Sequence, residues 1–161
     1  MKQNSIIGIV IIFLLCFSWP VWGQVGKVVI TDVSVQELAG DVSISIRGEI
    51  QAEGEGSIFL QASTTYENKE YFTAPREIKY ALSREAFSLS FSREDFELVD
   101  LKENKVEKLP QLAKGERLVV YVYEKKITSP EGQTEEVKQD IERTGYALRG
   151  ILAKATRVLE F

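Results

Sequence analysis

The chain has 161 residues, the length of one domain or of one domain plus a removable segment, with 44% hydrophobic residues, 27% charged residues and a net charge of −4. It contains no histidine, and its single cysteine and both tryptophans, Cys16, Trp19 and Trp22, precede residue 24. The remainder therefore has no side chains for Ser-His-Asp or Cys-His catalysis, for histidine- or cysteine-ligated zinc, for haem or iron–sulfur ligation, or for disulfides.

Residues 1–23 have the pattern of a secretory signal peptide. Lys2 supplies a positive charge, and an apolar run follows from Ile6 to Phe17. Pro20 interrupts this run before it reaches the roughly 20 apolar residues that a membrane-spanning helix needs. Gly23 is a small residue at the position where signal peptidase cleaves. We therefore predict cleavage after Gly23 and export to the periplasm or the extracellular space.

The mature domain is predicted to span residues 24–161 without a stable membrane anchor. Cys16 raises the alternative of a lipoprotein signal, whose cysteine is acylated, but that signal needs a small residue directly before the cysteine. Leu15 stands there, and the apolar run continues beyond Cys16. The mildly acidic balance argues against a nucleic-acid partner, since non-specific binding to phosphates requires a basic patch. Nothing in the sequence indicates a cofactor.

The first third of the domain is predicted to form strands. Residues Lys27 to Leu38 are rich in β-branched side chains, and a hairpin turn is expected at Ala39 to Asp41. The next segment, Asp41 to Ala52, alternates strictly between apolar and polar residues, as a half-buried antiparallel strand requires. Its apolar face consists of Val42, Ile44, Ile46, Gly48, Ile50 and Ala52. A turn at Gly54 to Gly56 precedes a further alternating strand, Ile58 to Tyr66.

Shorter alternating segments follow. Pro75 ends a strand at Tyr71 to Thr73, and two more strands are expected at Ile78 to Leu82 and Phe87 to Phe91. Phe96 to Val99 is a further short strand candidate.

The charged stretch 100–108 is predicted to be a solvated loop, and a central strand follows it. Leu118 to Glu124 is apolar on both faces apart from its last residue, which is typical of a strand inside a sheet. Tyr121 and Tyr123 are interpreted as core residues of its second face.

The C-terminal third admits two interpretations. Ser129 to Gly132 suits a type I turn. We favour a hairpin after it, which would place Glu135 and Glu136 across from Lys125 and Lys126. The alternative is a short helix that begins after Thr134 and ends before Gly145. In either case Tyr146 to Leu152 is expected to form a strand.

Several short strands separated by turns predict a mainly β protein, a single antiparallel β-sandwich, with the short C-terminal helix as the open alternative. The pattern resembles immunoglobulin-like or fibronectin type III-like sandwiches. Leu112 to Leu118 resembles the approach to their tyrosine corner, with Leu118 in the place of the tyrosine. The mature chain has neither the tryptophan nor the cysteine pair of antibody domains. The resemblance is therefore one of pattern, and it indicates no particular family.

Two groups of acidic residues are candidates for chemical sites. The segment Ser92 to Asp95, with Asp100, Glu103 and Asn104 nearby, offers oxygen atoms to calcium, but the chain lacks the Asp-x-Asp spacing typical of such sites. A solvated loop is the preferred interpretation. Glycosidase chemistry needs two carboxylates that face each other. The nearest pairs are Glu53 with Glu55 and Glu94 with Asp95, and nothing in the sequence buries them. No catalytic residue is assigned.

Three aromatic residues are the candidates for contact with a ligand or partner. Tyr66, Tyr71 and Phe72 flank the polar loop at Glu67 to Glu70. Exposed rings stack on sugars or anchor a partner protein, whereas the alternative is that these rings cap one end of the core. The expected function is a non-enzymatic exported module that binds or scaffolds another envelope or secreted protein. A carbohydrate-binding module and a small carboxylate-dependent hydrolase are the alternatives.

Overall fold

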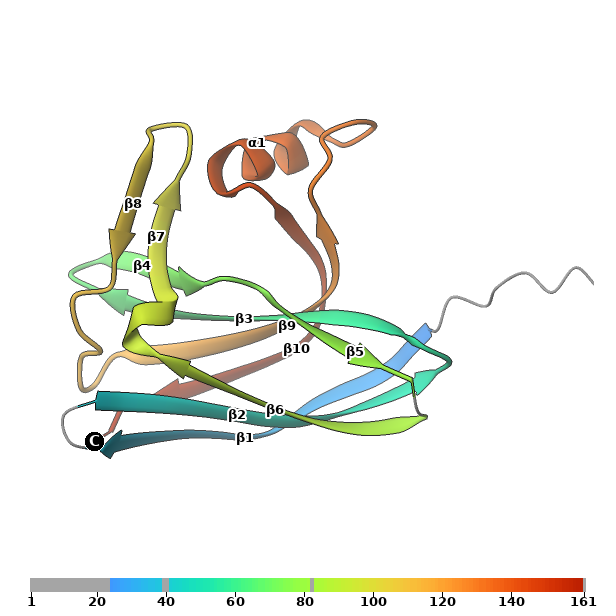
Figure 1. Cartoon of the computed structure of the whole chain (residues 1–161), viewed down its shortest axis with the longest axis horizontal. Helices are drawn as coiled ribbons and strands as arrows, with labels where there is room; N and C mark the ends of the chain where they lie inside the picture. The colour runs from blue at the N-terminus through green and yellow to red at the C-terminus, as the bar shows by residue number, and fades with distance from the viewer. Residues whose placement is uncertain (1–23, 39–40, 82, 161) are drawn as a thin grey trace, which may run out of the picture.

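The computed structural model describes residues 24–38, 41–81 and 83–160, which form antiparallel sheets and a short α-helix (Figure 1). The predicted signal peptide lies outside these residues, as do residues 39–40 of the first predicted turn. Within the described part, no helix is long and apolar enough to cross a membrane. The prediction of a mainly β protein is confirmed.

The smaller sheet has three strands in the order β1-β2-β6: β1 (Gln24–Leu38), β2 (Asp41–Glu53) and β6 (Arg84–Ser92). Leu38 lies opposite Asp41, so β1 and β2 form the expected hairpin. On β2, Ile44 and Ile46 are fully buried while Ser43 is exposed, which confirms the alternation predicted for this strand. The same holds on β6, where Phe87 and Phe91 are buried between exposed serines.

The larger sheet has seven strands. They are β3 (Gly56–Tyr66), β4 (Lys69–Thr73), β5 (Arg76–Tyr80), β7 (Phe96–Asp100), β8 (Lys105–Lys108), β9 (Arg117–Ile127) and β10 (Ala147–Val158). Their order is β10-β9-β3-β4-β7-β8, and β5 pairs with β3. A short 3-10 helix, η1 (Arg93–Asp95), connects β6 to β7. The strand β9 lies between β10 and β3, as its apolar sequence predicted.

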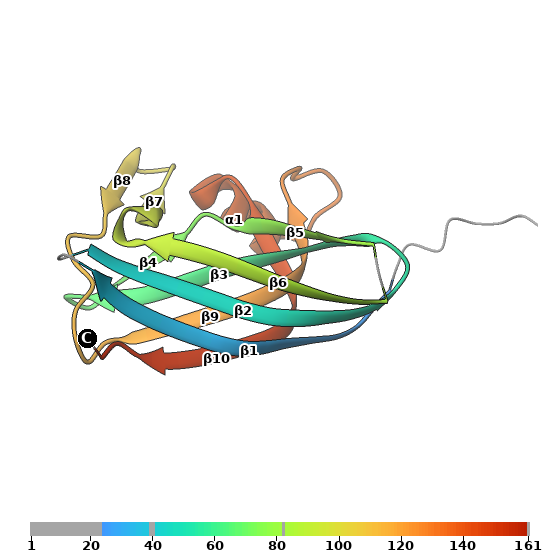
Figure 2. The same ribbon diagram turned by 60° about the horizontal axis from the view of Figure 1, so that its bottom comes forward.

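The two sheets pack face to face (Figure 2). The core between them takes apolar side chains from both, including Ile44, Ile46, Ile50 and Phe91 from the smaller sheet and Ile58, Leu60, Leu118, Val120 and Val122 from the larger. Immunoglobulin-type sandwiches place strands A, B and E in one sheet and C, F and G in the other. Here β1, β2 and β6 occupy the first set of places, and β3, β9 and β10 the second. The predicted antiparallel sandwich is confirmed.

The corner before β9 is held by the end of the chain. The Gly115 N–H donates to the Leu159 carbonyl at 2.8 Å, and the Leu159 N–H donates to the Glu116 carbonyl at 2.9 Å. Leu118 and Leu159 are both fully buried. Backbone hydrogen bonds and two leucines therefore hold the corner that a tyrosine hydroxyl holds in other sandwiches of this type.

The prediction of a loop at residues 100–108 was wrong in part, because residues 105–108 form β8 and pair with β7. Val99 lies opposite Val106, and Asn104 adopts φ 49° in the connecting turn. Charged side chains are compatible with this hairpin because it projects from the sheet and β8 is largely exposed to water (Figure 1).

The favoured hairpin after residue 130 was also wrong, and the alternative was right: residues Glu135–Thr144 form the helix α1. Glu135 and Glu136 lie in its first turn, where they interact favourably with the helix dipole. Gly145 ends the helix with φ 84°, a conformation that glycine adopts at little cost, and its N–H donates to the Ile141 carbonyl. Lys125 and Lys126 pair instead with Arg149 and Leu148 of β10.

The turn before α1 is displaced by one residue from the prediction. The Gln133 N–H donates to the Pro130 carbonyl at 3.3 Å, so Gly132 occupies the third position of the turn rather than the fourth. Its φ of 70° is the reason a glycine fits there.

Candidate functional site

A pocket of about 720 Å³ lies on the face of the larger sheet that is turned away from the core. Its floor comes from β3, β4 and β9, and its walls come from β7, α1 and the start of β10. The lining residues are Gln61, Glu70, Phe72, Thr73, Ala74, Glu97, Leu98, Val99, Asp100, Tyr123, Asp140, Arg143, Thr144, Tyr146, Ala147, Leu148 and Arg149.

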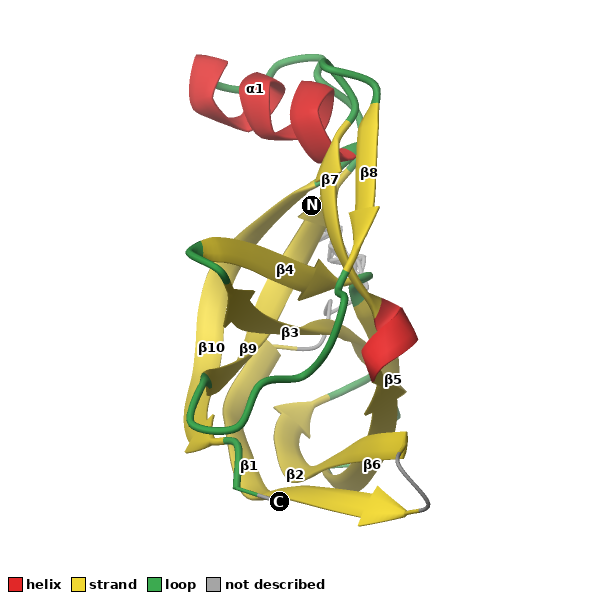
Figure 3. Ribbon diagram, turned by 90° about the vertical axis from the view of Figure 1, so that its left-hand side faces the viewer, coloured by secondary structure: helices red, strands yellow, loops and turns green. Residues whose placement is uncertain are grey.

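Both walls are insertions into connections of the sandwich. The β7–β8 hairpin lies between β6 and β9 in the chain, and α1 lies between β9 and β10. The walls meet where the Leu101 N–H, next to the end of β7, donates to the Arg143 carbonyl in the last turn of α1 at 2.7 Å. Figure 3 shows α1 beside the β7–β8 hairpin at the end of the molecule away from the smaller sheet. The insertions thus support one another and enclose the pocket.

The hairpin is also anchored from below by a tyrosine and a carboxylate. The hydroxyl of Tyr71, a buried residue of β4, donates to Glu107 Oε1 of β8 at 2.6 Å, and Lys69 Nζ lies 2.9 Å from the same oxygen. The hydrogen bond from Tyr71, with further help from Lys69, lowers the pKa of Glu107 from 4.5 to about 2. The same hydrogen bond raises the pKa of Tyr71 to about 12. Both shifts favour a protonated phenol facing an ionised carboxylate.

This anchor predicts a pH dependence. The pKa of Glu107 is depressed in the folded state. The contribution of Glu107 to stability is therefore present above about pH 4.5 and is lost as the pH falls toward 2. Tyr71→Phe should therefore be less stable than the wild type in denaturant titrations at pH 6, and this difference should disappear near pH 2. On the alkaline side, the contribution of Tyr71 is present below pH 10 and lost as the pH rises through 12.

Lys79→Ala is the control for this anchor, since Lys79 is exposed on β5. The free energy of unfolding of Lys79→Ala should differ little from that of the wild type, and this difference should not change between pH 6 and pH 2. If the deficit of Tyr71→Phe were the same at pH 6 and at pH 2, the anchor would not be the source of the pH dependence.

A buried amide organises the floor of the pocket. Gln61 is only 6% exposed, and its Nε2 donates both to the Thr73 carbonyl at 2.9 Å and to the Tyr146 hydroxyl at 2.8 Å. These bonds connect β3 to β4 and to the start of β10. Burial raises the pKa of Tyr146, and burial together with the nearby Tyr121 and Glu70 raises the pKa of Tyr123. Both phenols are therefore neutral at physiological pH.

The pocket carries more negative than positive charge. Its lining has four carboxylates and two guanidinium groups. Arg149 forms an ion pair with Asp140 at 3.0 Å and donates to the Leu148 carbonyl at 2.8 Å, while Arg143 lies 3.8 Å from Asp140. Arg149 is therefore already engaged within the protein, whereas the side chain of Arg143 is 62% exposed.

The three predicted aromatic candidates do not form one site. Phe72 lines the pocket and is 36% exposed. Tyr71, its neighbour on β4, faces the opposite way and belongs to the core at 1% exposure. Tyr66 is half-buried and packs against the core, and its hydroxyl accepts a hydrogen bond from Gln111. Tyr71 and Tyr66 thus pack with the core, and Phe72 is the one of the three that lines the pocket.

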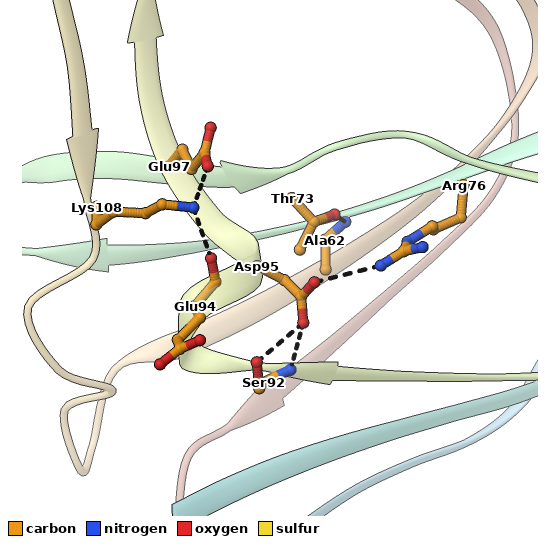
Figure 4. Close-up of polar contacts among 8 residues, drawn as sticks. All are labelled: Ala62, Thr73, Arg76, Ser92, Glu94, Asp95, Glu97 and Lys108. Atoms are coloured by element: carbon orange, nitrogen blue, oxygen red, sulfur yellow. Dashed lines mark hydrogen bonds and ion pairs between the residues drawn. The ribbon is translucent and has the colours of Figure 1, made fainter.

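The acidic candidates Glu94 and Asp95 lie outside the pocket lining and have structural contacts (Figure 4), whereas Asp100 lines the pocket. Asp95 accepts hydrogen bonds from the Ser92 N–H and hydroxyl and forms an ion pair with Arg76 at 3.3 Å. Lys108 Nζ donates to the Glu94 carbonyl at 3.0 Å and pairs with Glu97. Asp100 accepts the Glu103 N–H in the hairpin turn. Among the described residues, no three His, Cys, Asp or Glu side chains are grouped so as to hold a metal ion.

The proposed catalytic pairs gain no support. Glu53 at the end of β2 and Glu55 in the following turn are both exposed, and neither they nor Glu94 and Asp95 line the pocket. The carboxylates that do line it come from β4, β7 and α1, which are distant in sequence.

Sequence reasoning missed Gln61, Tyr123 and Tyr146 as pocket residues. Tyr121 and Tyr123 were interpreted as core, but both are only half-buried, and Tyr123 lines the pocket. The signal was present in part: β9 is apolar on both faces, and only one of them is covered by a second sheet. Gln61 gave no signal, because one amide within an alternating strand is common on exposed faces.

Comparison with known proteins adds little. No family model matches the chain, and no curated protein matches it in sequence. A solved structure that the chain resembles is a β-glucosidase from Streptomyces venezuelae in complex with D-glucose, at 12% sequence identity and a TM-score of 0.39. The likeness covers 83% of this chain and 15% of the β-glucosidase chain, and nothing about function follows from it.

Proposed function

We propose that the chain is a non-enzymatic, exported binding module that recognises another envelope or secreted protein through the pocket between the β7–β8 hairpin and α1. The observation that carries the proposal is the pocket itself: about 720 Å³, lined by apolar and aromatic side chains together with charged and polar ones. Ligand sites in proteins have this size. The signal-peptide pattern of residues 1–23 supports the location outside the cytoplasm.

Binding is favoured over catalysis by the state of two of the four pocket carboxylates and of the pocket tyrosines. Asp140 is neutralised by Arg149, and Glu97 by Lys108. Burial raises the pKa of the tyrosines away from physiological pH instead of bringing them near it. A general acid or base works best with a pKa near the working pH. Phe72, which is exposed at the pocket rim, has the character of an anchor for a partner.

The test is capture of a partner by the purified mature protein from the envelope and secreted fractions of the cells that make it. The wild type and Tyr66→Ala should retain the same protein, and Phe72→Ala should retain at least about tenfold less, as expected for loss of an anchor residue. Tyr66 is the matched aromatic control because it lies outside the pocket lining.

Three results would overturn the proposal. The first is a captured protein that binds equally well to Phe72→Ala. The second is binding to a glycan array that depends on Phe72, which would favour the carbohydrate-binding alternative. The third is turnover of a glycoside or ester substrate, which would favour the hydrolase alternative.

A further inference from the structure

The pocket lining offers both hydrogen-bond donors and acceptors. Gln61 uses its amide nitrogen for both of its hydrogen bonds, to the Thr73 carbonyl and to the Tyr146 hydroxyl. Arg149 is held by Asp140 at 3.0 Å and by the Leu148 carbonyl, whereas Arg143 lies 3.8 Å from Asp140. The kind of ligand that suits the pocket therefore depends on the unpaired charges of its lining.

Two carboxylates in the lining have no cationic partner. Glu70 accepts a hydrogen bond from the Ser63 hydroxyl at 3.0 Å, and Asp100 accepts the Glu103 N–H at 3.1 Å. Neither takes part in an ion pair within the described part of the chain. These two groups account for the excess negative charge of the pocket.

The same sheet face already uses its rings to hold cations. Lys154 Nζ lies 5.1 Å from the centre of the Tyr121 ring, and Lys126 Nζ lies 5.4 Å from that of Tyr146. Such contacts between ammonium groups and rings are favourable. Tyr123, whose ring centre is 5.8 Å from that of Tyr121, and Phe72 offer two more ring surfaces in the pocket.

We propose that the pocket takes a cationic side chain, lysine or arginine, from the partner protein, with its charge toward Glu70 and Asp100 and its aliphatic stem against Phe72 and Tyr123. An ammonium carries three donors and a guanidinium five, and neither has an acceptor, which matches the two carboxylates without a cationic partner. This inference rests on the proposed function, because it names the group by which the partner is recognised.

The experiment is an NMR titration of the mature protein with four N-acetyl amino-acid methylamides: those of lysine, arginine, norleucine and glutamate. Norleucine has an apolar stem like that of lysine and no charge. The lysine and arginine compounds should shift the Gln61 side-chain amide and the Phe72 backbone amide in a saturable way. The norleucine and glutamate compounds should bind at least about fivefold more weakly.

The matched variants replace charge without removing acceptors. Glu70→Gln combined with Asp100→Asn keeps an oxygen for Ser63 and for the Glu103 N–H, and it should weaken binding of the lysine compound at least fivefold. Glu55→Gln removes one charge from an exposed turn outside the pocket and should leave binding unchanged. Raising the salt concentration should weaken binding of the wild type, because salt screens the attraction.

Equal binding of the lysine and norleucine compounds, or an unchanged affinity in the double variant, would overturn this inference. If either of these results is found but capture of a partner still depends on Phe72, the proposed function stands without the cationic side chain. If the cationic compounds bind as expected while no captured protein depends on Phe72, the proposed function fails and the cation site remains.

Discussion

Replacing Ile46 with alanine should lower the free energy of unfolding by about 2–5 kcal/mol, through lost burial and a residual cavity. Ile46 is fully buried in the middle of β2, opposite Val33 of β1 and Leu89 of β6, so neighbouring strands hold the space open on both sides. Domains of this size have a total stability of only about 5–15 kcal/mol, so a fall in the thermal midpoint should be plain. Ile44→Ala should behave in the same way.

Ser43→Ala is the control on the same strand. Ser43 is exposed, and its replacement should change stability by less than about 0.5 kcal/mol. Urea titrations of the variants decide the matter. Equal losses at Ser43 and Ile46 would show that the two faces of β2 are not distinct.

Gly48→Ala should cost about 1–3 kcal/mol even though alanine is the better strand residue, because the site has no room for a methyl group. A Cβ at Gly48 would lie 2.6 Å from the Val29 carbonyl oxygen and 2.3 Å from Phe87 Cζ. The aromatic ring of Phe87 packs over the glycine from the adjacent strand, and the backbone oxygen of β1 cannot move away without breaking the pairing of the sheet.

Gly26→Ala is the matched glycine control. It lies exposed on β1, and the nearest atom to its Cβ would be the Gln51 carbonyl oxygen at 3.4 Å. The thermal unfolding midpoint of Gly26→Ala should stay close to that of the wild type, whereas the midpoint of Gly48→Ala should fall. Adding Phe87→Leu to Gly48→Ala should recover part of the loss, since the ring is one of the two obstacles. A Gly48→Ala midpoint equal to that of Gly26→Ala would contradict the close packing.

The sandwich could be predicted from sequence because alternation reports burial directly. On β2 and β6 one face meets the core and the other meets water, and each apolar position of the pattern corresponds to a buried or half-buried residue. The choice between a strand and α1 after residue 134 was harder. Glutamate and lysine suit a helix, but they also suit an exposed strand whose neighbour carries opposite charge. The helix is fixed by Gly145 and by the contact between Arg143 and Leu101, and a tertiary contact of that kind leaves no mark in the local sequence.

The pocket could not be predicted for a related reason. Its residues come from strands, a hairpin and a helix that only the fold brings together, and β8 looks like a solvated loop when its pairing with β7 is unknown. Phe72 was found because aromatic residues beside a polar loop are unusual. Tyr123 was assigned to a core because an apolar second face normally means a second covering layer, whereas here insertions cover only part of it.

The position of β9 between β3 and β10 governs the order of events during folding. Its partner β3 precedes it by about 50 residues and its partner β10 follows it, and the corner before it is held by Leu159. Sheets dominated by such non-local pairing fold in about milliseconds to seconds, slower than helical domains of similar size. The end of β10 at Val158 lies 158 − 127 = 31 residues after the end of β9, so at about 5–20 residues each second a ribosome leaves β9 without β10 for about 2–6 seconds. During that interval one edge of β9 carries unpaired backbone groups, which is the kind of surface on which chains aggregate.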